Sequence, residues 1–166
     1  MISLKIFNLK EKKGLSLIEA LVVLFIIGII TAVALPYFFG FYSGAELKTA
    51  GRRIASVLRA AKSYAEAKNV DYQVVFSIPV ANKLEMAIYE DPSGLNTKVG
   101  KTEKIELSSS VVFSTTFTDN KVTFTPHSTS NGGTVEITNT SKNKEVDVSV
   151  CSNTARVSIS DIKPPD

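Results

Sequence analysis

The segment KKGLSLIEALVV, Lys12–Val23, places a carboxylate near the start of a long apolar stretch. After Glu19 the next charged residue is Glu46. An ionised acid in hydrocarbon costs free energy unless it finds a partner, so an acid in such a stretch is by default a functional residue. The role of Glu19 therefore decides what this chain does.

The net charge of the chain is concentrated at its N-terminus. The 166 residues, enough for one domain plus a membrane or interaction segment, include 19 Lys and Arg and 16 Asp and Glu, a formal charge of +3. Residues 1–14 hold four lysines against Glu11, which leaves 15 basic and 15 acidic residues in the remainder. A chain without this leader would have no net side-chain charge, so the mild basicity does not indicate a nucleic-acid partner.

The apolar stretch from Ala20 to Tyr42 has three interpretations. It is long enough to cross a bilayer, which takes about 20 residues, and the basic leader would stay cytoplasmic. A secretory signal peptide would be cut after Ala32-Val33-Ala34, but the apolar run continues beyond that point and Glu19 lies where such a peptide is uncharged. A plain transmembrane anchor explains the length and leaves Glu19 unexplained.

The third interpretation begins at Gly14. Basic residues, a glycine and then Leu-Ser-Leu-Ile-Glu resemble the class III signal of type IV pilins and type II secretion pseudopilins. The resemblance implies that a prepilin peptidase cuts after Gly14 on the cytoplasmic side. Leu15, where the family usually has Phe, then becomes an N-methylated terminus. Glu19 falls fifth after the cut, and Gly28 and Pro36 also fall at positions that the family uses.

The resemblance also implies a partner for Glu19. The methylated amine at Leu15 keeps its charge, and within one helix it lies about 6 Å along the axis from Glu19. In a filament, a staggered neighbour can place its own N-terminus against Glu19 instead. A buried charge without a partner is costly, so this pairing would fix the register of assembly. Gly28 and Pro36 are expected either to melt the helix on assembly or to kink it in the ordinary way.

A second helical segment is expected over residues 43–68. Apolar residues at three- and four-residue spacing predict one buried face, made of Leu47, Ala50, Ile54, Val57, Leu58, Ala61 and Ala65. Ser43 and Glu46 have the spacing of a capping box, which allows the helix to stop near Gly40–Gly44 and restart. The expected divisions are a leader at 1–14, a transmembrane or filament-core helix at 15–42, an amphipathic helix at 43–68 and a β-rich domain at 69–166.

From Asn69 onward, short alternating runs predict about seven strands and an α+β fold of the pilin type, with an antiparallel sheet packed on the long helix. One hairpin is expected between residues 72–78 and 84–88, and a second between 111–118 and 121–125 across Asp119-Asn120. Later strands are expected at 134–138, 146–150 and 156–160. Phe113, Phe117 and Phe124 are expected in the core.

The stretch FTPHSTSNGGTVEI, residues 124–137, narrows the resemblance when taken with residues 155–159. It is similar to the C-terminal part of the GspH/FimT group of minor pilins and pseudopilins, in which a strand ends, a Gly/Ser-rich loop follows and a strand resumes. Gly132-Gly133 makes a tight turn accessible. The resemblance extends over nearly the whole chain and is weakest in the middle strands.

The residues that carry enzyme chemistry are sparse. His127 is the only histidine, which excludes a histidine-rich metal site, and the serines lack a recognisable base. His127 is expected to face solvent. Cys151, the only cysteine, is expected to be a small semi-buried residue near a strand end rather than a reactive or intermolecular thiol. A solvated acidic face, rather than a cation site, is expected from Glu85, Glu90, Asp91, Glu103 and Glu106. No enzymatic activity, metal or cofactor is expected.

The resemblance implies a minor pseudopilin of a type II secretion-like system, which begins or caps a short periplasmic filament that drives protein export. The implied partners are other pilin or pseudopilin subunits, prepilin peptidase, an inner-membrane assembly platform and membrane lipid. The implied location is the bacterial inner membrane, crossed once, with the C-terminal domain in the periplasm and the protein in a filament after assembly.

Two alternatives remain. One is a minor pilin of a type IV pilus, with a role in assembly priming or DNA uptake; the other is a monomeric tethered domain, for which Gly14 would be dispensable. DNA binding needs clustered Lys and Arg, whereas residues 69–166 hold 9 basic and 12 acidic side chains. Only Lys142, Lys144 and Arg156 offer a small patch, so DNA is not an expected partner.

Overall fold

The computed structural model describes residues 16–90 and 97–165. The chain divides into two compact units, Met1–Phe39 and Gly40–Asp166. Helix α1, Leu17–Lys68, contributes residues to both units. It continues through residues 40–44, so the interruption that the capping-box spacing allowed there is absent from α1.

The first unit contains the N-terminal part of α1. From Ser16 to Leu35 every side chain is exposed, and most of them are apolar. The hydroxyl of Thr31 donates to the carbonyl of Ile27 at 2.7 Å, so this polar group is satisfied inside the helix. A helix that is apolar on all sides belongs in an apolar surrounding rather than in water.

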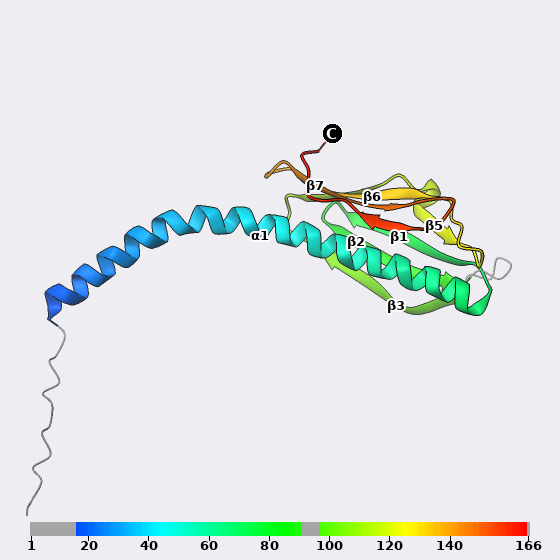
Figure 1. Cartoon of the computed structure of the whole chain (residues 1–166), viewed down its shortest axis with the longest axis horizontal. Coiled ribbons are helices and arrows are strands. Elements are labelled where there is room, and N and C mark those ends of the chain that lie inside the picture. The colour runs from blue at the N-terminus through cyan, green and yellow to red at the C-terminus, as the bar shows by residue number, and fades with distance from the viewer. Residues whose placement is uncertain (1–15, 91–96, 166) are drawn as a thin grey trace, which may run out of the picture. The chain divides into compact units, whose positions relative to one another are not determined.

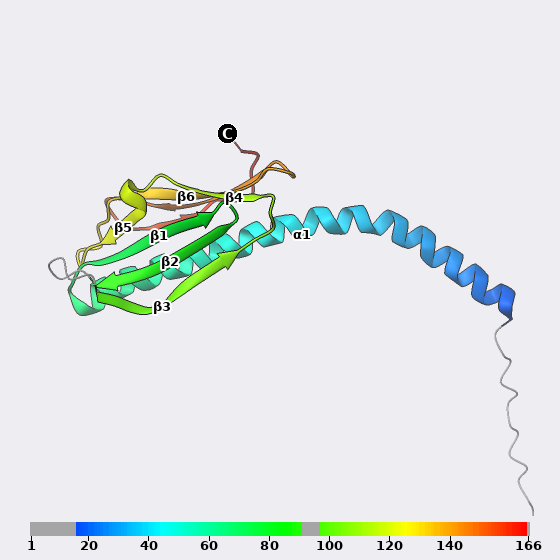
Figure 2. The same ribbon diagram turned by 180° about the vertical axis from the view of Figure 1, so that it is seen from behind.

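The second unit contains two four-stranded antiparallel sheets beside the later part of α1 (Figures 1 and 2). The first sheet has the order β3-β2-β1-β5, with β1 Tyr72–Val80, β2 Lys83–Glu90, β3 Thr97–Glu106 and β5 Lys121–Phe124. The second has the order β4-β6-β7-β8, with β4 Val111–Thr115, β6 Gly133–Asn139, β7 Lys144–Val150 and β8 Val157–Ile159. The expected α+β class is confirmed, but the strands form two sheets instead of one.

The first expected hairpin is confirmed and the second is wrong. β1 pairs with β2, with Val74 opposite Ile88. β4 and β5 lie in different sheets, because β4 pairs with β6 and β5 pairs with β1. A 3₁₀ turn, Thr118–Asn120, separates them, with φ of 55° at Asp119 and 53° at Asn120. Asp119 and Asn120 do form a turn, as their sequence predicts, but the turn carries the chain from the second sheet to the first.

Strand β3 was not predicted from the sequence. Its residues, TKVGKTEKIE, include only Val99 and Ile105 as large apolar side chains, and most of the strand is exposed. β3 is an edge strand that pairs with β2 in antiparallel fashion. Two exposed cross-strand ion pairs accompany this pairing, at 3.0 Å between Lys83 and Glu106 and 2.8 Å between Lys104 and Glu85. Charged residues protect an exposed edge strand from pairing with another chain. Because they replace apolar residues, the sequence of β3 lacks the alternating pattern that predicts a strand.

One hydrophobic cluster joins α1 to both sheets. The predicted apolar face of the helix is confirmed: Leu47, Ile54 and Leu58 are fully buried, while Val57 is only partly buried. Gly51 allows close packing on the second sheet, since a Cβ there would lie 3.2 Å from Val146. The three expected core phenylalanines, Phe113, Phe117 and Phe124, are buried.

Candidate assembly site

Glu19 lies in the first turn of α1, where the helix dipole favours a negative charge. It is exposed, and its apolar neighbours Leu17 and Ile18 keep 83% and 69% of their surface. Within the described residues it forms neither an ion pair nor a side-chain hydrogen bond, and it is the only charged residue between Ser16 and Leu35. Its carboxylate is therefore unpaired among residues 16–90 and 97–165.

The segment around Glu19 is long and apolar enough to cross a membrane. It covers Leu17–Leu35, 19 residues, none of them buried within the protein. At about 1.5 Å per residue such a helix is about 28 Å long, close to the hydrocarbon thickness of about 30 Å. This length places Glu19 near one end of the span.

Of the other predicted site residues in the N-terminal part, the structure describes the backbone of two, Gly28 and Pro36. Gly14 and Leu15 lie outside the described residues. Gly28 and Pro36 are both inside α1 with helical backbone, and a Cβ at Gly28 would meet nothing within 4 Å. Because proline has no N–H, the carbonyl of Ala32 lacks its usual helical donor at Pro36. Melting or kinking at these two residues stays a prediction.

His127 and the acidic residues of the β-rich part differ in exposure. His127 is exposed, as expected. Glu103 and Glu106 are exposed too, but Glu85 and Glu90 are only partly exposed; Asp91 lies outside the described residues. Glu90 accepts a hydrogen bond from the hydroxyl of Tyr72 at 3.0 Å. In the part of the chain that the structure covers, no group of three His, Cys, Asp or Glu residues could hold a metal ion.

Cys151 departs from its expected environment. It follows the end of β7 as predicted, but its side chain is exposed rather than semi-buried. Hydrogen bonds from the Thr154 side chain and from the backbone of Asn153 and Thr154 lower the pKa of the Cys151 thiol, and the Arg156 charge adds to this. These groups stabilise the thiolate over the thiol.

The small basic patch does not form. Arg156 precedes Val157, which pairs with Val150 at the far end of β7 from Lys144. Lys144 and Val150 are six residue steps apart along the strand, about 20 Å at about 3.3 Å per residue. Lys142 lies beyond Lys144, so the two lysines and Arg156 stand at opposite ends of the strand.

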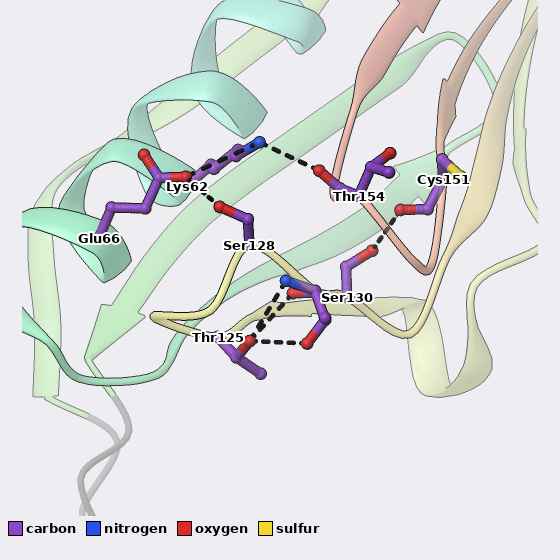
Figure 3. A network of polar contacts seen from close by, with 8 residues as sticks. Lys62, Glu66, Thr125, Ser128, Ser130, Cys151 and Thr154 are labelled. Carbon is purple, nitrogen blue, oxygen red and sulfur yellow. Dashed lines mark hydrogen bonds and ion pairs between the residues drawn. The ribbon is translucent and has the colours of Figure 1, made fainter.

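A polar network that the sequence did not predict ties the loop after β5 to α1 (Figure 3). The Ser128 hydroxyl donates to Glu66 at 2.6 Å, and Lys62 donates to the carbonyl of Thr154 at 3.1 Å. Ser130 reaches the carbonyl of Cys151 at 3.2 Å. Spacing alone suggests only the Lys62–Glu66 helix pair, at 3.7 Å. The loop in the stretch of residues 124–137 is thus fastened to the helix.

Comparison with known proteins bears on two features of the chain, its N-terminal signal and its fold. The family described as the prokaryotic N-terminal methylation motif matches residues 9–35, which include Gly14, Leu15 and Glu19. No curated protein matches the chain significantly.

Among the solved structures that are similar to this fold are those of two proteins from bacterial secretion and pilus systems. One is the minor pseudopilin EpsH from the type 2 secretion system of Vibrio cholerae, with a TM-score of 0.55, 10% identity, and coverage of 70% of this chain and 97% of that one. The other is the type IV minor pilin FimU of Pseudomonas aeruginosa, with a TM-score of 0.56, 16% identity, and coverage of 72% and 92%. Neither name denotes an enzyme. A pilin-like fold therefore follows an N-terminal methylation motif in this chain, and the apolar helix and motif together indicate a membrane-anchored protein.

Proposed function

We propose that this pilin-like chain is a minor pseudopilin of a type II secretion-like system and helps to begin or cap a short periplasmic filament that drives protein export. The observation that carries the proposal is the lone exposed carboxylate of Glu19 on an otherwise apolar helix. A tethering helix needs no such acid, whereas a subunit that must be aligned with a neighbour does.

In this proposal, prepilin peptidase cuts after Gly14 and the methylated amine of Leu15 keeps its positive charge. The amine of one subunit then binds Glu19 of the adjacent subunit in the apolar filament core. Because an unpaired charge there is costly, subunits in any other register are disfavoured. Insertion of the helix into the inner membrane places the β-rich domain in the periplasm.

A minor pilin of a type IV pilus is the second candidate, since FimU has the same fold. Export is favoured over DNA uptake because the β-rich part is net acidic, and DNA binding needs clustered basic residues. The β-rich part from residue 69 onward has three more acidic than basic side chains, and the three basic residues that offered a patch are separated along β7. A salt-dependent titration with DNA tests this order: tight binding that weakens steeply with salt would reverse it.

The experiment that tests assembly uses the full chain in its native host. Glu19→Ala is expected to abolish incorporation into the filament, whereas Glu19→Asp retains part of it. Thr31→Ala, which removes another polar side chain from the same segment, serves as the control and is expected to assemble normally. Normal incorporation of Glu19→Ala would remove the proposed role of the carboxylate.

Processing is tested separately by the intact mass of the protein. The wild-type chain is expected to begin at a methylated Leu15, and Gly14→Ala to retain its leader and stay out of the filament. An uncut leader in the wild-type chain, or a start at Leu35, would contradict the proposal. Identification of secretin or retraction-motor genes beside this gene would separate secretion from a pilus.

A further inference from the structure

A groove of about 390 Å³ lies between α1, β7 and the C-terminal segment of the second unit. Three cations from two elements line it, Lys48 and Arg52 of α1 and Lys144 of β7. Among the residues that the structure describes, no Asp or Glu lines this groove. The other lining residues are small or aliphatic: Gly44, Ala45, Thr49 and Ile162. This basic groove therefore favours a negatively charged group beside an apolar one.

Three parts of the chain meet at Gly44. This glycine is buried, and a Cβ there would lie 3.1 Å from Cδ1 of Ile162 and 3.6 Å from Nζ of Lys144. The cation of β7 thus lies close to the backbone of α1. Ile162 keeps 38% of its surface. The apolar wall of the basic groove is therefore still accessible to a partner.

The positive charge of this part of α1 is not balanced by the acids of the helix. Residues 43–68 include six Lys and Arg and two acids, Glu46 and Glu66, an excess of four positive charges. Both acids accept hydrogen bonds from serines outside the helix. Arg52 is exposed and forms no ion pair with any described residue. The basic groove therefore lies on a helix with positive charge to spare.

The chain places an acid of its own at the edge of the basic groove. Oδ1 of Asp161 lies 3.4 Å from Nζ of Lys48, with 97% of the Asp161 side chain and 43% of the Lys48 side chain exposed. So solvated a pair contributes little to stability, and another carboxylate can replace Asp161 at small cost. Asp161 directly precedes Ile162. The chain itself thus shows the combination that the groove accepts, a carboxylate beside an aliphatic side chain.

A protein segment suits this groove better than a free anion or a phosphate surface. Small anions and phosphates can pair with the cations, but they leave Ile162 and Ala45 in water. A segment that carries an acidic and an aliphatic residue covers these apolar side chains too, and burial of apolar surface stabilises the contact. The lining therefore favours an acidic segment of another protein.

We propose that the basic groove binds an acidic segment of a different pilin-like subunit, whose carboxylate replaces Asp161 beside Lys48 and Arg52. The inference rests on the proposed function, which brings subunits of several kinds together. A subunit that begins or caps a filament meets other chains rather than a series of its own copies, so the occupant belongs to a different subunit. Asp161 acts as an internal substitute for that carboxylate before assembly.

Photocrosslinking of the full chain in its native host tests the contact. The photoreactive residue p-benzoylphenylalanine replaces Thr49, an exposed residue that lines the basic groove. Irradiation is expected to join it to a different pilin-like chain, at a peptide that mass spectrometry shows to contain Asp or Glu. The control carries the same group at Ser63, which is exposed on α1 about 21 Å farther along the helix. The control should give no such product.

The charge of the groove is tested in the same background. Arg52→Glu is expected to lower the yield of the crosslink about fivefold, and Arg52→Lys to leave it unchanged. Arg53→Glu changes the adjacent exposed arginine, which lines a different groove, and should have no effect. A lysine in place of the crosslinked acid of the partner should restore the yield with Arg52→Glu.

Asp161→Asn distinguishes an internal substitute from a structural contact. Loss of this carboxylate is expected to raise the yield of the crosslink about twofold, because it no longer competes with the partner for Lys48. The Tm should not change, since the pair is solvated. A lower yield would mean that Asp161 supports the contact instead, which would overturn the proposed competition.

The outcomes also separate this inference from the proposed function. Three results would overturn the inference and leave the proposed function intact: equal yields for Arg52→Glu and Arg53→Glu, a product joined to a second copy of this chain, to lipid or to DNA, and normal filaments without any crosslink. A wild-type chain that is processed but never enters a filament would overturn both.

Discussion

Glu46 of α1 accepts two hydrogen bonds from Ser108, one from the backbone N–H at 2.8 Å and one from the hydroxyl at 3.2 Å. Ser108 lies between β3 and β4, where the chain passes from the first sheet to the second. A backbone N–H in such a connection needs an acceptor, and the helix supplies it. The spacing of Ser43 and Glu46 suggested a helix cap, but the Glu46 carboxylate bonds a residue 62 positions away.

Loss of this contact is expected to destabilise the fold. Glu46→Ala removes both acceptor oxygens and should lower the free energy of unfolding by about 1 kcal/mol, because one backbone N–H then depends on water. Urea unfolding of the full chain in detergent, followed by circular dichroism, measures the change. Glu103→Ala, at an exposed acid of β3, is the control, and equal stability of the two variants would contradict the prediction.

Gly133 is a position where the backbone conformation and the neighbouring side chain both require glycine. Its φ is +143°, and a Cβ there would overlap the ring of Phe117, which is buried and stacks on Phe76 at 5.4 Å between centroids. Gly133→Ala is therefore expected to cost about 2–3 kcal/mol, measured as a lower Tm. Gly100→Ala has a φ of +76° and open space, so about 1–2 kcal/mol of strain is expected. An equal decrease in Tm for the two variants would show that the Phe117 ring moves away from the new Cβ at little cost in stability.

The thiol of Cys151 is expected to react as a thiolate at lower pH than an ordinary cysteine. Its pKa is lowered chiefly by the Thr154 side chain, so the midpoint of its alkylation rate against pH should fall below the usual value of about 8.5. Thr154→Val removes that hydrogen bond and keeps the backbone carbonyl that Lys62 uses. The variant should shift the midpoint upward; an unchanged midpoint would exclude the hydroxyl as the cause.

The buried acid Glu145 makes stability depend on pH. It keeps 7% of its surface, and burial, followed by the hydrogen bond and charge of Asp147, raises its pKa; Lys163 opposes this and Glu136 adds to it. The neutral form is favoured in the folded state. The stabilisation is therefore complete below the unfolded pKa, near 4.5, and is lost as the pH rises through the higher folded pKa.

Glu145→Gln, which is always neutral, is expected to raise Tm above the folded pKa and to match the wild type below the unfolded one. Thermal unfolding of the full chain in detergent from pH 4 to 8 measures this. Glu103→Gln, on an exposed strand, should leave the pH profile unchanged. A lower Tm for Glu145→Gln at neutral pH would mean that the ion pair with Lys163, at 3.6 Å, outweighs the cost of burial.

The sequence predicted elements well where the pattern is local and apolar. The helix face that includes Leu47, Ile54 and Leu58 has helical period, and the β1–β2 hairpin has alternating residues around a short turn. The sequence does not predict β3, because its exposed edge position favours charged residues over the apolar ones that mark a strand. The predicted hairpin between β4 and β5 is wrong. A polar turn between two strands is compatible with their pairing and with their separation into different sheets.

The long helix, the lone acid in its apolar part and the α+β class follow from the amino-acid sequence alone, since they depend on the spacing of residues near one another in the chain. The division into two sheets, the exposure of Cys151 and the hydrogen bonds between Glu46 and Ser108 arise from contacts between distant parts of the chain. Those features depend on which distant groups bury apolar surface together and satisfy each other's hydrogen bonds, and one segment's pattern is compatible with several such partners.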